Sequence, residues 1–225
     1  MLNLDENDKL STYTNLIFEG NQKSNLTGYK NHEDIYKQGI LDSILIRKTL
    51  ENNGYDFLDK TILDIGAGAG FPSMPWKIYN DNFNLEIVES LGKRVNFLKN
   101  ITTELNLSVN VFNERVERLK NRNCYYDLIT ARAVTSVKNL FMLAHHLLKP
   151  NGFFIMPKGR NYKQELKEIS HIFPEIKKDI KVFSYINSQN DESYIIVIQK
   201  TTKTPVKWPF EWKKIMSFGV NKLPQ

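Results

Sequence analysis

An acid followed by three alternating glycines is the feature of this chain that most directly indicates chemistry. Residues 61–72 read Thr-Ile-Leu-Asp-Ile-Gly-Ala-Gly-Ala-Gly-Phe-Pro, so an apolar, strand-like run leads into a glycine-spaced turn. Glycines let the main chain turn sharply and let a ligand approach it closely, and the helix expected next directs its N-terminus at the same place. The pattern is typical of a loop that binds a nucleotide-type cofactor.

The carboxylate of Asp64, two residues before Gly66, restricts what that cofactor can be. It would repel a pyrophosphate, and Phe71 stands where a dinucleotide-binding loop has its third glycine. A cationic ligand without phosphate, such as S-adenosylmethionine, would tolerate the acid. A tight turn that binds nothing is the alternative, but it would sacrifice backbone entropy at the glycines for no gain. We therefore expect Asp64, Gly66 and Gly68 to lie at a cofactor site.

Three further polar residues follow predicted strands, where open parallel sheets bind ligands. Glu89 ends the second strand and can accept the two ribose hydroxyls of an adenosine group; the alternative is a solvated acid. Glu117 follows the third strand and could reach the adenine edge; the alternative is a first-turn helix acid that favours the helix dipole. Arg132 follows the fourth strand and could pair with the cofactor carboxylate or an RNA phosphate. Its alternative is a salt bridge to Asp127 or Asp64.

The residues that are missing narrow the reaction. Residues 130–134 read Thr-Ala-Arg-Ala-Val, without the Asp/Asn-Pro-Pro-aromatic clamp expected for methylation of an exocyclic amine. Cys124 precedes its strand, the wrong end for a nucleophile in pyrimidine C5 methylation. A ring nitrogen such as guanine N7 has a free lone pair, so alignment alone could suffice. We expect no catalytic residue, since the four histidines (His32, His145, His146 and His171) fall in predicted helices where none is placed as a base.

The segments that must position these residues alternate between strand-like and helix-like patterns. Strands are predicted at 61–65, 85–89, 109–112, 127–131, 152–157, 182–186 and 194–200. Helices are predicted at 72–79, 93–105, 116–120, 137–148 and 162–173, with Pro150-Asn151-Gly152 as a turn. This order predicts an α/β fold, a Rossmann-like, mostly parallel sheet of seven strands covered by helices.

The chain divides into three predicted regions. Residues 1–60 read as a helical N-terminal cap, residues 61–200 as the sheet domain, and residues 201–225 as a basic, aromatic, proline-punctuated tail outside the core. The 225 residues suffice for one such domain with an extension, and 41% hydrophobic with 25% charged residues is ordinary for a globular protein.

Charge and cysteine content restrict partners and cellular location. The formal charge of +6 suits a polyanionic partner, and the single cysteine excludes an intramolecular disulfide and a cysteine-based metal cluster, so no metal site is expected. No apolar run is long enough to cross a bilayer, and the N-terminus lacks the pattern of a signal peptide. We expect a cytoplasmic protein that does not bind membranes.

Several segments together resemble one family, the small-subunit (16S) ribosomal RNA guanine-N7 methyltransferases, also called the glucose-inhibited division protein B (GidB) family. The matching segments span most of the chain: Asn25-Leu26-Thr27, Leu41-Asp42-Ser43-Ile44, residues 64–72, residues 89–98, Arg115-Val116-Glu117, Ala131-Arg132-Ala133 and Pro157-Lys158-Gly159. The resemblance implies a class I S-adenosylmethionine-dependent methyltransferase fold and a guanosine in the decoding-region loop of 16S rRNA as substrate. It implies cofactor contacts at Gly66, Phe71, Glu89, Ser90, Leu91, Val116, Glu117 and Arg132.

The chain departs from the family at positions that concern RNA more than cofactor. Gly39 stands where a histidine is usual, Gly20 replaces an aromatic residue, and Phe210 replaces an arginine in the tail. The cofactor loop is intact. These departures bear on how the RNA docks.

A basic set is expected to meet the RNA backbone: Lys93, Arg94, Lys158 and Arg160. A solvated basic surface is the alternative. The leading hypothesis is an rRNA methyltransferase that acts on free 16S rRNA or the small ribosomal subunit, as a monomer. The alternatives are a methyltransferase of the same fold for a protein or small molecule, and an RNA-binding module without turnover.

Overall fold

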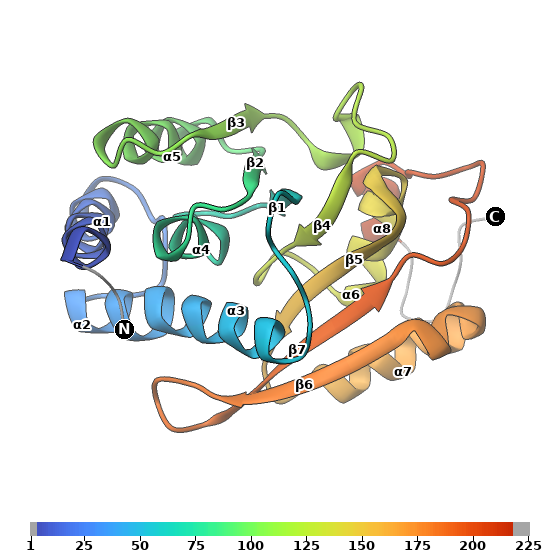
Figure 1. Cartoon of the computed structure of the whole chain (residues 1–225). Helices are drawn as coiled ribbons and strands as arrows, with labels where there is room; N and C mark the ends of the chain where they lie inside the picture. Colours follow the sequence, from blue (N-terminus) through green and yellow to red (C-terminus); the bar gives the residue numbers. More distant parts are fainter. Residues whose placement is uncertain (1–3, 218–225) are drawn as a thin grey trace.

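The computed structural model describes residues 4–217, which form one seven-stranded sheet with helices on both faces (Figure 1). The strand order is β3-β2-β1-β4-β5-β7-β6. All strands run parallel except β7, which is antiparallel to both neighbours. The strands are β1 (Thr61–Ile65), β2 (Asn84–Glu89), β3 (Val109–Asn113), β4 (Tyr126–Thr130), β5 (Leu148–Lys158), β6 (Ile180–Ile186) and β7 (Glu192–Gln199). The predicted sheet of seven mostly parallel strands is confirmed.

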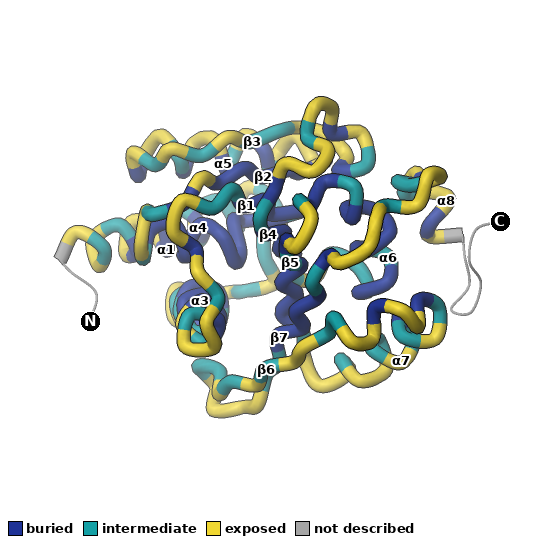
Figure 2. The backbone as a smooth tube through the Cα atoms, turned by 45° about the vertical axis from the view of Figure 1, so that its right-hand side comes forward, coloured by how far each residue is buried: buried dark blue, intermediate teal, exposed yellow. Residues whose placement is uncertain are grey.

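Alternation along β1 assigns its side chains to two cores. Ile62 belongs to the core under the N-terminal helices, and Leu63 to the core on the other face. A strand covered on both faces is largely apolar, and in β1 the run Ile62, Leu63 and Ile65 is interrupted only by Asp64. Figure 2 shows the central strands as buried and most outer turns as exposed.

Two groups of helices cover the sheet (Figure 1). The first consists of α1 (Leu4–Lys23), α2 (His32–Asp34), the π-helix η1 (Ile35–Leu41), α3 (Asp42–Asn52), α4 (Ser73–Tyr79) and α5 (Gly92–Glu104). The second consists of α6 (Val137–Ala144), α7 (Tyr162–Ile172) and α8 (Trp212–Ser217), with 3-10 turns η2 (Val116–Arg118), η3 (His145–Leu147) and η4 (Pro174–Asp179). No helix within residues 4–217 is long and apolar enough to cross a membrane.

Three local predictions were wrong. The helix predicted at 116–120 is only the 3-10 turn η2, and the helix predicted at 137–148 already leaves α-geometry at His145. The turn predicted at Pro150-Asn151-Gly152 lies inside β5, which starts at Leu148 because that residue pairs with Tyr126 of β4. A register shift and the positive φ of Asn151 (62°) absorb the turn-forming residues within the strand.

The composition of the tail suggested that it lies outside the core, but part of it is packed into the core. Ile215 is fully buried and Phe210 is 7% exposed, both within the core beneath α6 and α7. Trp208 packs edge-on against Phe141 and Phe173, with ring centroids 5.7 and 5.5 Å apart. The aromatic residues that made the tail look irregular are therefore the ones that attach it to the α6 face.

Candidate functional site

The glycine loop between β1 and α4 needs glycine at each of its three positions. Gly66, Gly68 and Gly70 have φ angles of +64°, +60° and +110°, a region that disfavours residues with a Cβ. The amide of Gly66 donates to the carbonyl of Val88 on β2 (2.8 Å), which fixes the loop where β1 ends. The main chain is thus turned back across the carboxyl ends of β1 and β2.

The N-terminal cap holds this loop from behind. The fully buried Tyr13 hydroxyl of α1 donates to the Ala69 carbonyl (2.7 Å). Phe71 points into the cap, where its ring packs against Tyr13 and Tyr29 (centroids 6.0 and 6.2 Å). Its ring also fills the space that a Cβ on Gly39 would need. Phe71 is predicted from the sequence to contact the cofactor; in the structure its ring supports the loop from within the cap, and it is not among the residues that line the hollow described below.

Asp64 is a fully buried carboxyl group with one oxygen left over. Its Oδ2 accepts the Ser73 amide (3.2 Å), whereas Oδ1 has no donor in the described part of the chain. Burial raises the pKa of Asp64 to about 7, and the charge of Glu89 raises it further. The hydrogen bond from Ser73 and the charge of Arg132 act in the opposite direction. An orphaned acceptor of this kind fits a cationic or hydrogen-bond-donating ligand.

Glu89 joins the loop to the end of β2. It is 3% exposed, and its two oxygens accept the amides of Leu91 (3.0 Å) and Gly68 (3.4 Å). Arg94 lies 3.8 Å away on α5. The carboxylate is therefore oriented by groups on both sides, as the acceptor of two neighbouring hydroxyls must be.

A hollow of about 270 Å³ opens beside Glu89 at the carboxyl ends of β1, β2 and β3. Its lining is Ile65, Gly66, Val88, Glu89, Ser90, Leu91, Arg94, Glu114, Arg115, Val116, Glu117, Ala133, Val134 and Trp212. Of the cofactor residues predicted from sequence, the structure brings together Gly66, Glu89, Ser90, Leu91, Val116 and Glu117 around it. Asp64, Gly68, Phe71 and Arg132 do not line it and lie in the loop and strands behind.

Glu117 carries a second orphaned oxygen at the far end of the hollow. Its Oε1 accepts the backbone amide of Trp212 (3.0 Å), while Oε2 is buried without a donor among residues 4–217. Sequence reasoning missed Trp212, which lies in the divergent tail. The only signal for it was the aromatic content of that tail.

Arg132 connects β4 to the cap, and within residues 4–217 it forms neither of its alternative salt bridges, to Asp127 or to Asp64. Its guanidinium binds Gln38 O (2.8 Å), Tyr29 Oη (3.2 Å), Gly39 O (3.4 Å) and Ser43 Oγ (3.4 Å). The alternative pairing with Asp127 is wrong, because that acid binds Lys149 (2.9 Å) at the other end of β4. Carbonyl oxygens of the π-helix satisfy the charge, so Arg132 positions the cap over the loop.

The four basic residues predicted to meet RNA differ in availability. Lys93 is exposed at the start of α5, and Arg94 is partly exposed on the rim of the hollow. Arg160 is exposed and pairs with Asp191 (2.7 Å). Lys158 is only 13% exposed and is held by Glu165 (2.8 Å) and the Thr135 carbonyl (3.0 Å). Its ammonium is therefore occupied within the protein.

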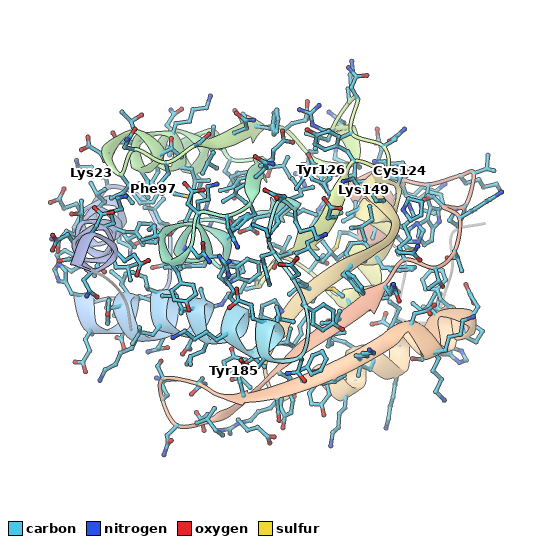
Figure 3. The ribbon with its side chains drawn as sticks, viewed as in Figure 1. Lys23, Phe97, Cys124, Tyr126, Lys149 and Tyr185 are labelled. Carbon is cyan, nitrogen blue, oxygen red and sulfur yellow. The ribbon has the colours of Figure 1, made fainter. Side chains whose placement is uncertain are left out.

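The opposite edge of the sheet holds the buried His145, the half-buried His146 and the exposed Cys124. Figure 3 shows Cys124, Tyr126 and Lys149 grouped where β4 begins. His145 and His146 precede β5 at this edge, and burial, with the charge of Lys200, lowers their pKa values to about 3 and 4. A second hollow of about 460 Å³ opens here, and none of the predicted site residues lines it.

The sequence matches one family of proteins over most of its length. The sequence profile described as rRNA small subunit methyltransferase G matches residues 6–192. The ribosomal RNA small subunit methyltransferase G of Streptococcus gordonii is 34% identical over 214 residues, covering 91% of this chain and 87% of that protein. The protein of that name from Mycoplasma capricolum is 36% identical over 171 residues, covering 76% and 72%.

A solved structure shares the fold at low sequence identity. The crystal structure of an S-adenosylmethionine-dependent methyltransferase from Aquifex aeolicus aligns with a TM-score of 0.52 at 16% identity, covering 74% of this chain and 93% of that one. The sheet is therefore that of the class I methyltransferases, as predicted. The hollow at its carboxyl edge lies where this fold class binds its ligands.

Proposed function

The chain belongs to the rRNA small subunit methyltransferase G family, and from this we propose that it methylates guanine N7 in 16S rRNA with S-adenosylmethionine as donor. The observation that carries the proposal is the pair of orphaned buried carboxylate oxygens, Glu117 Oε2 in the lining of the glutamate-centred hollow and Asp64 Oδ1 behind the glycine loop that borders it. Buried acceptors without donors favour a ligand with several N–H or O–H groups.

The residues present fit this cofactor in three places. We propose that Glu89 accepts the two ribose hydroxyls and that Glu117 Oε2 accepts the adenine amino group. Val116 and Val134 line the hollow beside Glu117 and offer apolar contact to a purine. Gly66, with Asp64 behind it, takes the methionine portion, whose ammonium suits a carboxylate. The bound cofactor supplies an electrophilic methyl group on a sulfonium.

The chain's own part in the reaction is positioning. Guanine N7 has an available lone pair and loses no proton when methylated, so no side chain needs to act as a base. Fixed placement of both partners can supply a large part of such a rate enhancement. Asp64 and Glu89 would also weakly favour the positive charge that forms on the purine.

The route of the RNA is proposed from charge and shape. Arg94 borders both the cofactor hollow and a neighbouring one of about 690 Å³ between α1 and α5. Amide, aromatic and basic groups line this neighbouring hollow, among them Asn21, Asn25, Tyr29 and Lys30. Such groups bind phosphates and unstacked bases. We propose that 16S rRNA docks here, with Lys93 and Arg160 as outer phosphate contacts.

A direct experiment tests the proposal. The protein is incubated with methyl-labelled S-adenosylmethionine and small subunits from cells that lack this methylation, and any modified base is mapped. Label at a guanine N7 of 16S rRNA is the expected result. Label on protein without RNA would support the small-molecule or protein alternative, and RNA binding without label would support a module that lacks turnover.

The proposed substrate also bears on location and assembly. Ribosomal subunits as substrate support a cytoplasmic location. The described residues of a single chain line the hollow, which favours action as a monomer. Sedimentation of the protein at micromolar concentration, alone and with RNA, tests the second point: a stable dimer would contradict it.

A further inference from the structure

We propose that the C-terminal helix α8 completes the adenine end of the cofactor hollow and that Trp212 is a cofactor-contacting residue. The inference rests on the proposed function and extends it to a segment whose composition gave no sign of a site. It makes cofactor affinity depend on the attachment of the tail.

The first support is that only one of the two carboxylate oxygens of Glu117 has a hydrogen-bond donor in the described part of the chain. Oε1 accepts the Trp212 amide at 3.0 Å, and Oε2 is buried and has no donor in residues 4–217. One carboxylate therefore faces the tail with one oxygen and has its other oxygen free for a ligand donor. An amine of the adenine ring is a donor that matches this acceptor.

The second support is the position of the Trp212 side chain. Trp212 lines the hollow together with Val116, Ala133 and Val134, and among residues 4–217 it is the one lining residue from beyond β7. The Arg115 guanidinium lies 5.6 Å from its ring centroid and fixes one face of the indole. A large aromatic wall beside apolar side chains suits a purine, which packs on aromatic rings.

The third support is that the wall is firmly attached. Ile215, one turn further along α8, is fully buried in the core beneath α6. Glu211 lies 3.8 Å from Arg118 of η2, and Asn139 of α6 contacts the Met216 sulfur at 3.7 Å. The helix is thus bound to the same η2 turn that carries Glu117, and a ligand that orders this turn also favours the docked tail.

Binding measurements on matched variants test the inference. Trp212→Ala is compared with Lys213→Ala, the exposed neighbour on α8, by calorimetry with S-adenosylhomocysteine and with adenosine. We expect Trp212→Ala to raise the dissociation constants of both ligands about five- to tenfold, because they share the adenine end. Lys213→Ala should leave both unchanged, and thermal unfolding shows whether each variant is folded.

A second readout remains if Trp212→Ala does not fold. The other tryptophans, Trp76 and Trp208, do not line the hollow, so Trp212→Phe should remove the change in tryptophan fluorescence that S-adenosylhomocysteine causes in the parent protein. A signal that persists in Trp212→Phe, or parent-like affinity in folded Trp212→Ala, overturns the inference alone. A parent protein that does not bind S-adenosylhomocysteine overturns the proposed function and this inference with it.

Discussion

The hydroxyl of Tyr13 on α1 donates to the carbonyl of Ala69 in the glycine loop at 2.7 Å, across 56 residues of sequence. Both residues are buried, and burial, with the charge of Asp64 adding, raises the pKa of Tyr13 well above its usual value. The phenol therefore remains a neutral donor at every working pH. The shape of the cofactor loop is thus partly set by a helix that contributes nothing to the hollow itself.

Removing this hydroxyl should weaken both fold and site. Tyr13→Phe leaves the Ala69 carbonyl buried without a donor, which costs about 1–3 kcal/mol. We expect denaturant unfolding to show this loss and calorimetry to show weaker S-adenosylhomocysteine binding. Tyr36→Phe is the matched control, since no described residue hydrogen-bonds its hydroxyl. Equal stability of the two variants would contradict the role assigned to Tyr13.

Substitution of the first loop glycine should abolish cofactor binding. Gly66 has φ of +64°, and a Cβ there would lie 2.9 Å from Val134 Cγ2. In Gly66→Ala, the left-handed backbone costs about 1–2 kcal/mol and the methyl group crowds the wall of the hollow. Gly66→Val should be worse. Gly159→Ala, whose Cβ meets nothing within 4 Å, should behave like the parent protein in calorimetry.

Because the pKa of Asp64 is raised in the folded protein, we expect the free energy of unfolding to fall as pH rises. Its pKa is about 7 in the native state, above the ordinary value of 3.8, because the carboxyl is buried. Between these two values the native state holds a proton that the unfolded state has lost, so unfolding free energy decreases with increasing pH and levels off above about pH 7. Asp64→Asn should flatten this dependence in urea unfolding measured from pH 5 to 8. A parallel slope in the variant would rule out Asp64 as its source.

The same group should link cofactor affinity to pH. An ammonium near Asp64 favours the ionised carboxylate, so binding of S-adenosylhomocysteine at pH 6 should release a proton and its affinity should rise toward pH 7. When binding releases one proton, the affinity can rise by at most tenfold per pH unit. Glu89 opposes this ionisation and Arg132 assists it. Calorimetry in two buffers of different ionisation enthalpy counts the protons. Uptake instead of release would contradict the placement of Asp64.

Two lysines of the basic set should behave differently. Lys93→Ala removes an exposed charge, so RNA binding should weaken and the salt dependence should fall by about one phosphate contact, with stability unchanged. Lys158→Ala removes the cation that pairs with the half-buried Glu165 and leaves that carboxylate only the Val137 amide, so stability should fall while the salt dependence remains. Filter binding at several potassium chloride concentrations separates the cases. A reduced salt slope for Lys158→Ala would show that this lysine reaches the RNA.

The chemical step should lack a titrating base. With RNA bound and cofactor saturating, the single-turnover rate should be flat from about pH 7 to 9, because N7 needs no deprotonation. His145 and His146 directly precede β5 and therefore lie at the edge of the sheet opposite the cofactor hollow. Their pKa values are lowered to about 3 and 4. A rate that rises with pH over this range would contradict N7 as the acceptor.

The sheet was predictable because its central strands are covered on both faces and are therefore largely apolar. The positions of Glu89 and Glu117 beside the hollow were predictable because the carboxyl ends of neighbouring parallel strands lie at the same edge of the sheet. Arg132 could be placed at that edge but not assigned its partners, because four groups of the distant cap compete for its guanidinium. Sequence spacing cannot rank such long-range contacts.

The remaining misses have tertiary causes. Gly39 lies in a π-helix, and the ring of Phe71 occupies the space that a side chain at position 39 would need. This is a contact between segments far apart in the chain. Trp212 reaches the hollow because buried Ile215 fixes α8 on the α6 face, whereas the local composition around it indicates only an irregular tail. In both places the packing of distant segments decides the local role.

The Arg132 bridge to the cap also determines the order in which the protein can assemble while it is being made. The cap leaves the ribosome first, but the groups that cover its buried face, the glycine loop and then Arg132, are synthesised later. At about 5–20 residues per second the nascent cap exposes apolar surface for on the order of ten seconds before these partners arrive. The period in which this chain is most open to proteases and to misassociation is therefore spent on a ribosome.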